Sequence, residues 1–278
     1  MDSIVVVTSW WSNCLALACL HRLAEFAPRR KRVVVQAGKS AAQMERFRAW
    51  LPPGTEELPY PPHLPTDDSP MREYLARDAL RDFTGAWFFD HDALLRAPAE
   101  DWFAAADALF DRTGICLSTA VPREGPGLTQ PAYWMSPRRL PPDVPSFDPV
   151  PFRAKTYTRR PDLCRLDGRR LAIPEKDTLV RVAEHLAALG LAGTFPLDGE
   201  TARAHALPAF PPHLHLGGIH LYTGPVLPPR FADWMRLVVS SFDRFFAECP
   251  KEWLEAEEPE LLRRHREFKA ALHAGLES

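Results

Sequence analysis

The chain of 278 residues lacks the features of a membrane protein or of a protein that binds nucleic acid. Its amino end, MDSIVVVTSWWSN, has no basic segment followed by a long apolar one, and no later stretch supplies the ~20 apolar residues of a membrane span. The formal net charge is -2 and the pI is about 6.6, which does not favour a polyanionic partner. We therefore expect a soluble, cytoplasmic protein with no transmembrane segment and no nucleic-acid partner.

Cysteine is scarce and scattered. The five cysteines are an odd number and include no CxxC pair, which argues against both a disulfide framework and a structural zinc site. We expect reduced thiols, most of them buried. They are Cys14, Cys19, Cys116, Cys164 and Cys249.

Internal repeats, heptad arrays and low-complexity tracts are also missing. The chain is long enough for one large α/β domain or two small ones, and we expect one domain with a long tail. Residues 4–7 are a β-branched run typical of a strand buried on both faces, and residues 32–36 form a second such run. Between them an apolar stripe predicts a helix capped by Ser12 or Asn13 and stopped by Pro28. This order predicts a βαβ unit whose loops lie at the carboxyl edge of a parallel sheet.

Further elements follow from the same patterns. Seven prolines between Pro52 and Pro70 predict a surface loop without regular structure. Apolar residues every four positions predict a helix over residues 71–83, which leads into a strand over residues 86–89. We also expect helices over residues 102–110, 178–189, 231–249 and 261–272 and a strand over residues 115–119, with Asp177 as N-cap and Gly190 just past the end of the 178–189 helix.

The stretch WFFDHDAL carries Asp90 and Asp92 directly after the apolar strand. Two carboxylates at such a strand end repel each other unless a cation or a proton is shared between them. A hard cation such as Mg²⁺ or Mn²⁺ binds carboxylate oxygens and completes its shell with water and substrate phosphate. The alternative is that both acids are loop residues, one of which caps the following turn.

Two later segments could add to such a site. Asp177, in PEKDTL, suits a helix N-cap, and a carboxylate held there stays ionised and could also accept a proton from an attacking hydroxyl. The segment HLHLGGIHLYTG carries His213, His215 and His220. Histidines two apart on a strand share a face and could bind metal, or they could be ordinary polar residues of a mixed segment.

In their order, these pieces resemble a nucleotide-sugar-dependent glycosyltransferase of the GT-A fold, especially the family 2-like inverting enzymes. SPMREYLARDALRDFTGAWFFDHDAL is similar to that family's helix with an Ala-Arg-Asn step and the apolar strand that ends in its DxD motif. EKDTLVRVAEHLAALG resembles the Glu-Asp motif that leads a helix, and HLHLGG resembles the late histidine segment. PAYWMSP and PSFDP lie where the family has its acceptor-side strands, and the resemblance spans residues 3–222.

The resemblance implies an α/β GT-A (Rossmann-like) three-layer sandwich with a mostly parallel central sheet. Residues 1–228 would form the domain that binds nucleotide-sugar and acceptor, and residues 229–278 a C-terminal helical tail packed on it. It also implies a divalent metal, Mn²⁺ or Mg²⁺, and two partners, a nucleotide-sugar donor and an acceptor that bears a hydroxyl group.

Site residues are implied in the same way. Asp92 would be a metal ligand, and Asp90 would reach the metal directly or through water. The third protein ligand would be His215 or His220, with His215 preferred. Contacts to the donor would come from Thr8, Ser9, Trp10, Gln36, Arg77 and Asp90. The general base would be Asp177 or, as the alternative, Glu175, because Lys176 separates the two acids. Asp78 stands in place of the asparagine of the Ala-Arg-Asn step, and Gln36 stands where the family often has an acid that reads the base, so the nucleotide stays open.

The implied reaction is sugar transfer from a nucleotide-sugar to a hydroxyl, with inversion. The enzyme alternative is a phosphatase of the haloacid-dehalogenase type, which also has an Asp-x-Asp after an apolar strand. There the motif normally lies on the first strand and continues with Thr or Val, whereas here Ala93 follows and the pair lies ninety residues into the chain. The alternative without catalysis is a GT-A-like protein that binds a nucleotide or a partner.

Overall fold

The computed structural model describes residues 3–9, 12–119, 132–148, 150–156, 165–166, 169–170, 172–177, 179–192, 210–216 and 232–274. Within these ranges, the side chains of residues 150–156, 165–166, 169–170, 172–177, 180, 215, 232–235 and 237–238 are not described. The chain divides into two units, one of Met1–Val150 with Lys176–His215 and one of Pro151–Glu175 with Leu216–Ser278. The domain boundary expected after residue 228 stays a prediction.

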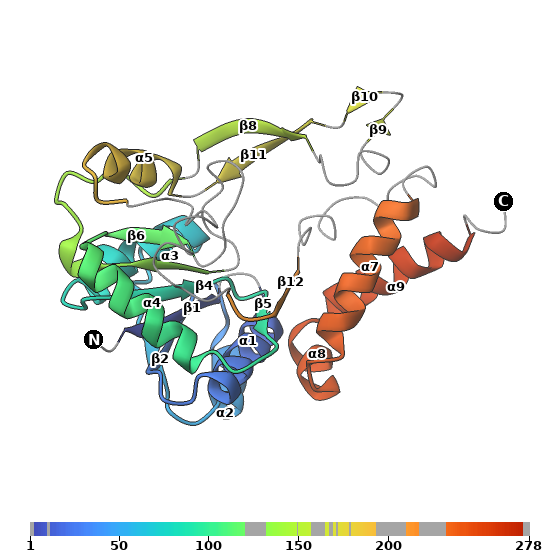
Figure 1. Cartoon of the computed structure of the whole chain (residues 1–278). Helices are drawn as coiled ribbons and strands as arrows, with labels where there is room; N and C mark the ends of the chain where they lie inside the picture. The colour runs from blue at the N-terminus through green and yellow to red at the C-terminus, as the bar shows by residue number, and fades with distance from the viewer. Residues whose placement is uncertain are drawn as a thin grey trace. The chain divides into compact units, whose positions relative to one another are not determined.

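The first unit is built on a six-stranded sheet with the order β3-β2-β1-β4-β7-β6 (Figure 1). Its strands are β1 (Ile4–Ser9), β2 (Arg32–Gln36), β3 (Thr55–Leu58), β4 (Ala86–Phe89), β6 (Leu117–Thr119) and β7 (Ala132–Met135). All are parallel except β7, which is antiparallel to both of its neighbours. The predicted mostly parallel α/β sheet is confirmed, because runs of buried β-branched and aromatic residues pair side by side.

Helices cover both faces of this sheet, which gives three layers. On one face, Phe88 and Tyr133 belong to a core cluster with Met71 and Leu186, which come from the helices on that side. These are α3 (Asp68–Tyr74), the π-helical turn η1 (Leu75–Ala79) and α5 (Val180–Ala188). On the other face, Trp87 contacts three aromatic rings of α4 (Glu100–Thr113). Helix α1 (Asn13–Phe26) joins that layer, since the N–H of Ala99 donates to the carbonyl of Phe26, and α2 (Ala41–Trp50) follows β2.

The start of α1 follows the predicted capping chemistry. Ser12 is the N-cap, and its Oγ accepts a hydrogen bond of 3.2 Å from the N–H of Leu15. Asn13, the other candidate cap, is the first residue of the helix. The expectation for the thiols is confirmed for the four described cysteines, which are buried and form no disulfide.

Two expectations about the elements are wrong, and the helix expected over residues 71–83 has other bounds. The proline-rich segment contains strand β3, because residues 55–58 hold no proline and their backbone groups can pair with β2. The helix expected over residues 71–83 begins at Asp68 and ends in a π-helical turn, where the N–H of Leu80 donates to the carbonyl of Leu75. Asp177 is not an N-cap. It ends strand β11 (Ala172–Asp177), and buried Leu179, with φ of 67°, precedes α5.

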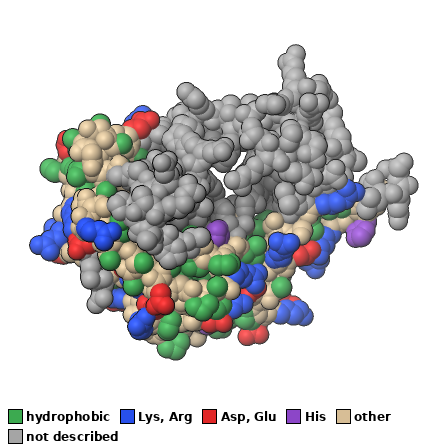
Figure 2. Space-filling view, viewed as in Figure 1, with side chains coloured by type: hydrophobic (Ala, Val, Ile, Leu, Met, Phe, Trp, Pro, Cys, Tyr) green, Lys and Arg blue, Asp and Glu red, His purple; other side chains and the backbone are tan. Residues whose placement is uncertain are grey.

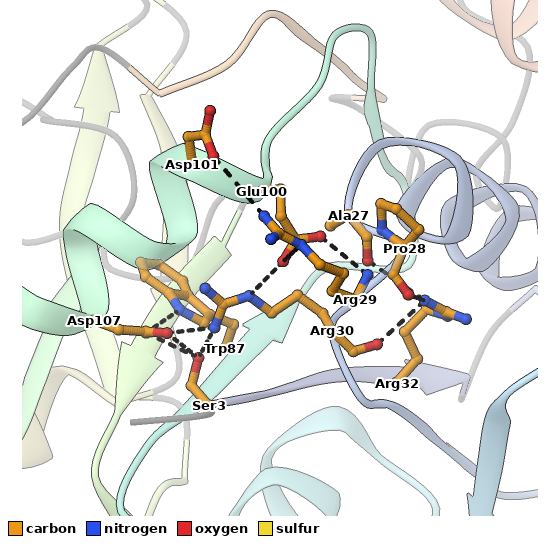
Figure 3. A network of polar contacts seen from close by, with 10 residues as sticks. All are labelled: Ser3, Ala27, Pro28, Arg29, Arg30, Arg32, Trp87, Glu100, Asp101 and Asp107. Carbon is orange, nitrogen blue, oxygen red and sulfur yellow. Dashed lines mark hydrogen bonds and ion pairs between the residues drawn. The ribbon is translucent and has the colours of Figure 1, made fainter.

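A buried polar network holds the amino edge of the sheet (Figure 3). The carboxylate of Asp107, on α4, accepts hydrogen bonds from Ser3 Oγ at 2.7 and 2.8 Å, from Trp87 Nε1 at 2.9 Å and from Arg30. Arg30 Nε also lies 3.3 Å from Glu100. These contacts join β1, β4, α4 and the turn before β2, so the strands are fixed at the edge opposite their carboxyl ends.

The second unit contains strands β9 (Arg165–Leu166) and β10 (Arg169–Arg170) and helices α7 (Ala232–Phe246), α8 (Lys251–Glu257) and α9 (Pro259–Ala274). Strand β8 (Val150–Thr156) pairs with β11. Helices α7 and α9 meet at His265, whose ring lies 4.9 Å from that of Phe246 and whose Nε2 lies 2.9 Å from Asp243 Oδ1. Lys269 Nζ donates to the same oxygen at 2.6 Å.

None of the described helices is long and apolar enough to cross a membrane. On the face drawn in Figure 2, the basic and acidic side chains of the described residues are interspersed with apolar ones.

Acidification should destabilise the contact between α7 and α9. Burial lowers the pKa of His265 although Asp243 opposes this shift, so the folded protein binds a proton less readily than the unfolded chain, whose histidine titrates near 6.5. The unfolded state therefore takes up more protons as the pH falls through 6.5, and the free energy of unfolding decreases. The pKa of Asp243 is also lowered, mainly by Lys269 and His265 against the effect of burial, which extends the loss to lower pH.

Urea unfolding of the wild type and of His265→Gln at about pH 7.5 and about pH 5.5 would test this. The advantage of the wild type over the variant should shrink at the lower pH. A difference that does not change with pH would contradict the assignment.

Candidate functional site

The candidate site lies where the strand order of the sheet reverses. From β1 the chain runs outward through β2 and β3, and it then returns to β4 on the other side of β1. The carboxyl ends of β1 and β4 therefore flank a topological switch point, where open α/β sheets bind their ligands. Thr8 and Ser9 end β1, and Asp90 directly follows β4 (Figure 1).

A hydrogen-bonded group of three side chains joins the ends of β1 and β2. Asn13 Oδ1 accepts from Ser9 Oγ at 3.1 Å and from Gln36 Nε2 at 3.2 Å, and all three residues are buried. Ser9 lies opposite Gln36 in the parallel register, and Asn13 reaches both because it begins the helix that follows β1. Gln36 Oε1 is buried and has no hydrogen-bond partner among the described residues.

A cavity of about 430 Å³ lies beside Gln36, at the carboxyl ends of β2 and β3. Its lining includes Gln36, Gly38, Lys39, Tyr60 and Thr66. Gly38 has φ of 70°, a conformation that suits glycine and turns the chain at the rim of the cavity. Several prolines of the 59–62 segment also line it, so the cavity combines flat apolar surfaces with a few polar groups.

A chain of charged contacts connects β1 to the acids after β4. Thr8 Oγ1 donates to Asp68 Oδ1 at 3.2 Å, and Arg72 Nε donates to Asp68 Oδ2 at 2.7 Å. Arg72 Nη2 then donates to Asp90 Oδ1 at 2.7 Å. Arg72 is 2 % exposed, so its guanidinium bridges two carboxylates out of water.

An aromatic pair supports this arginine. The guanidinium carbon of Arg72 lies 5.2 Å from the ring centre of Tyr133, which stacks on Phe88 at 4.9 Å. Burial alone would lower the pKa of Arg72, but Asp68, Tyr133 and Asp90 raise it well above its usual value, so the cation persists. Burial raises the pKa of Tyr133, so its hydroxyl keeps its proton at neutral pH.

Two neighbours of Asp90 and Asp92, His91 and Cys19, carry no charge at neutral pH. Burial lowers the pKa of His91 although Asp92 opposes the shift, so this imidazole is neutral at pH 7. Burial together with Asp92 and Asp90 raises the pKa of the Cys19 thiol, whose Sγ lies 3.8 Å from the carbonyl oxygen of Asp90. Both aspartates are 8 % exposed.

Backbone pairing places the late histidine segment beside the residue that follows Asp92. Strand β12 (His213–His215) is antiparallel to β5 (Ala93–Leu95), and His215 lies opposite Ala93, the residue after Asp92. The His213 ring lies 5.2 Å from that of Phe210. The side chain of His215, and His220 altogether, lie outside the described residues, so their predicted role as metal ligands stays a prediction.

The donor chemistry at Asp90 and Asp92 fits a hard divalent cation. Carboxylate oxygens are the ligands that Mg²⁺ and Mn²⁺ prefer, and such ions often take one or two carboxylates and complete their shell with water and substrate phosphates. Among the described residues, no group of three or more His, Cys, Asp or Glu side chains could hold a metal. The two aspartates would therefore hold the ion as an incomplete shell open to a ligand.

The remaining predicted site residues either make contacts away from these acids or are not described by the structure. Arg77 donates to Glu73 at 2.8 Å and to the carbonyls of Val144 and Pro145, so its described contacts brace a loop. Trp10 is outside the described residues, and the side chains of Glu175 and Asp177, on β11, are not described. Their roles toward a donor or acceptor stay predictions.

Sequence reasoning did not select Arg72, Asp68 or Asn13 as site residues. Asp68 and Arg72 are four residues apart, the spacing of an ion pair on one helix face, and this signal was present in the sequence. Nothing in the spacing showed that the same guanidinium would also reach Asp90, because that contact depends on how α3 packs against β1 and β4.

Comparison with known proteins was made by sequence and by structure. No protein-family model and no curated protein matches the chain. Similar solved structures include the galactosyltransferase LgtC with donor and acceptor sugar analogs, at 14% identity and a TM-score of 0.42, covering 90% of this chain and 99% of that one. They also include mouse xyloside xylosyltransferase 1, at 12% identity and a TM-score of 0.34, covering 50% of this chain and 69% of that one.

A third is a protein of Desulfovibrio desulfuricans G20 described as a nucleotide-diphospho-sugar transferase, at 14% identity and a TM-score of 0.36, covering 51% of this chain and 67% of that one. Each of the three is described as a sugar transferase. At such values the activity of this chain has to be argued from its own residues.

Removing the shared acceptor at Asn13 should destabilise the site. Asn13→Ala leaves the buried donors of Ser9 and Gln36 without their acceptor, which should lower the free energy of unfolding by about 1–3 kcal/mol. Asn13→Asp keeps an acceptor oxygen and places an acid in the first turn of α1, so it should lose less. Urea denaturation of both variants measures the difference, and an equal loss in both would contradict the role of the acceptor.

Proposed function

We propose that the protein is a metal-dependent glycosyltransferase that moves a sugar from a nucleotide-sugar to an acceptor hydroxyl, with inversion. The observation that carries this proposal is the position of Asp90 and Asp92 at the switch point of the sheet, beside Thr8 and Ser9. Ligands of open α/β sheets bind at this point, and paired carboxylates there suit a cation that is shared with a diphosphate.

The cavity beside Gln36 would receive the nucleobase. Flat proline and tyrosine surfaces offer stacking area, and Gln36 adds an amide to the lining of the cavity. Gln36 Nε2 donates to Asn13, which orients that amide. The diphosphate would then extend from this cavity toward Asp92.

The acids of the site would have different roles in the reaction. A divalent cation bound at Asp92 would stabilise the negative charge that develops on the departing nucleoside diphosphate. Asp177, or Glu175 as the alternative, would accept the proton of the acceptor hydroxyl as its oxygen attacks the anomeric carbon. Asp90, held by Arg72, would orient the donor or reach the cation through water.

A donor panel with metal control tests the proposal. The purified protein is incubated with UDP-, GDP- and TDP-sugars with and without Mn²⁺, and release of nucleoside diphosphate is measured. One donor should be turned over only with Mn²⁺, and it should also raise the thermal midpoint, because a ligand that binds only the native state adds stability.

Asp92→Asn should lower that turnover by about a hundredfold or more while the fold persists, since an electrostatic contribution of several kcal/mol is lost. Asp101→Asn is the matched control, because Asp101 is fully exposed on α4 and should keep wild-type turnover. Full activity of Asp92→Asn would refute the site assignment. Cleavage of a generic phosphate ester, with no donor turned over, would favour the phosphatase, and donor binding without turnover would favour a nucleotide-binding protein.

A further inference from the structure

Arg72 differs from Arg30, whose side chain is 8 % exposed and is also paired with two acids. Arg30 lies in a closed network at the amino edge of the sheet, where Ser3 and Trp87 also donate to its partner Asp107. Arg72 lies at the opposite edge, and its second partner is Asp90, one of the two candidate metal ligands. Its Nη1 is buried and has no hydrogen-bond partner among the described residues.

Arg72 makes one hydrogen bond of 2.7 Å to each of its two acids, from Nε to Asp68 and from Nη2 to Asp90. Asp68 is also held by Thr8, whose Oγ1 donates to it at 3.2 Å. If a cation took over the charge of Asp90, Arg72 would still be balanced by Asp68, so the pair with Asp90 can be exchanged without leaving a buried charge alone.

Charge at the site favours such an exchange. Among the described residues, the carboxylates of Asp68, Asp90 and Asp92 outnumber the cations that act on His91, which are Arg72 and Lys39. The positive charge of Arg72, 2.7 Å from a carboxylate oxygen of Asp90, reduces the attraction that any divalent cation would feel there.

We propose that Arg72 is a resident counter-cation of Asp90, which neutralises this acid in the metal-free protein and competes with the divalent cation for it. The inference rests on the proposed function for the existence of the cation site and goes beyond it in assigning Arg72 a positioning role. Arg72 thereby sets how tightly the site holds its metal and keeps the two acids from repelling each other when the metal is away.

Manganese affinity in the absence of any nucleotide-sugar tests the proposal. Arg72→Gln should bind Mn²⁺ about tenfold more tightly than the wild type by titration calorimetry, because removing a charge within a few ångströms leaves a more negative site. In EDTA the variant should have a lower thermal midpoint than the wild type, and added Mn²⁺ should raise its midpoint by more.

Arg30→Gln is the matched control, since it also removes a buried arginine paired with two carboxylates and lies at the other edge of the sheet. It should lower the thermal midpoint without changing Mn²⁺ affinity. Arg72→Lys keeps a charge but cannot span Asp68 and Asp90 with a fixed fork, so its affinity should lie between those of the wild type and Arg72→Gln. This conservative variant decides the matter if Arg72→Gln does not fold.

Weaker or unchanged Mn²⁺ binding in the folded Arg72 variants would overturn the proposal, as would the absence of Mn²⁺ binding in all proteins tested. Tighter binding in Arg72→Gln with no donor turned over would uphold the counter-cation and refute the transferase. If Arg72→Gln bound Mn²⁺ as the wild type does, and the wild type turned over a donor, the counter-cation would be refuted and the transferase upheld. The two proposals can therefore fail separately.

Discussion

The contact between the Arg72 guanidinium and the Asp90 carboxylate is the constraint on which the candidate site depends. An acid placed at the end of a buried strand is costly unless its charge is balanced, and Arg72 provides that balance from helix α3. Because Asp68 and Thr8 hold Arg72 in turn, the end of β1, helix α3 and the segment after β4 form one connected group. The fold can therefore carry two acids one residue apart at its ligand-binding edge.

The rest of the first unit fixes the strands whose carboxyl ends form that edge. The Asp107 network fixes the amino ends of β1 and β4, and the aromatic layers on both faces of the sheet hold Phe88 and Trp87 between helices. With the strands fixed in register, Ser9 and Gln36 lie opposite each other and Asn13 can accept from both. A site made of strand ends is rigid because each strand is held along its whole length.

The proposed activity and the proposed role of Arg72 both concern how charge is handled at this edge. Transfer of a sugar from a nucleotide-sugar leaves a diphosphate whose charge needs a cation, and the acids that would hold that cation need compensation before it arrives. The Arg72 guanidinium, which is also bound to Asp68, can balance the charge of Asp90 and release this acid when the cation binds. The backbone pairing of β12 with β5 places the late histidine segment beside the same acids, which extends the site toward the end of the first unit.

The sequence by itself determined the buried strands, a helix capped by Ser12 or Asn13 and the position of Asp90 and Asp92 at a strand end, because these depend on local periodicity and capping chemistry. It misjudged the proline-rich segment and the start of α5, where pairing with β2 and burial of Leu179 outweigh local preference. The tertiary structure alone decided that Arg72 reaches Asp90, that Gln36 lines a cavity and that β12 lies beside β5. Such contacts join residues far apart in the chain, and their geometry is fixed by how helices and strands pack, which no local pattern encodes.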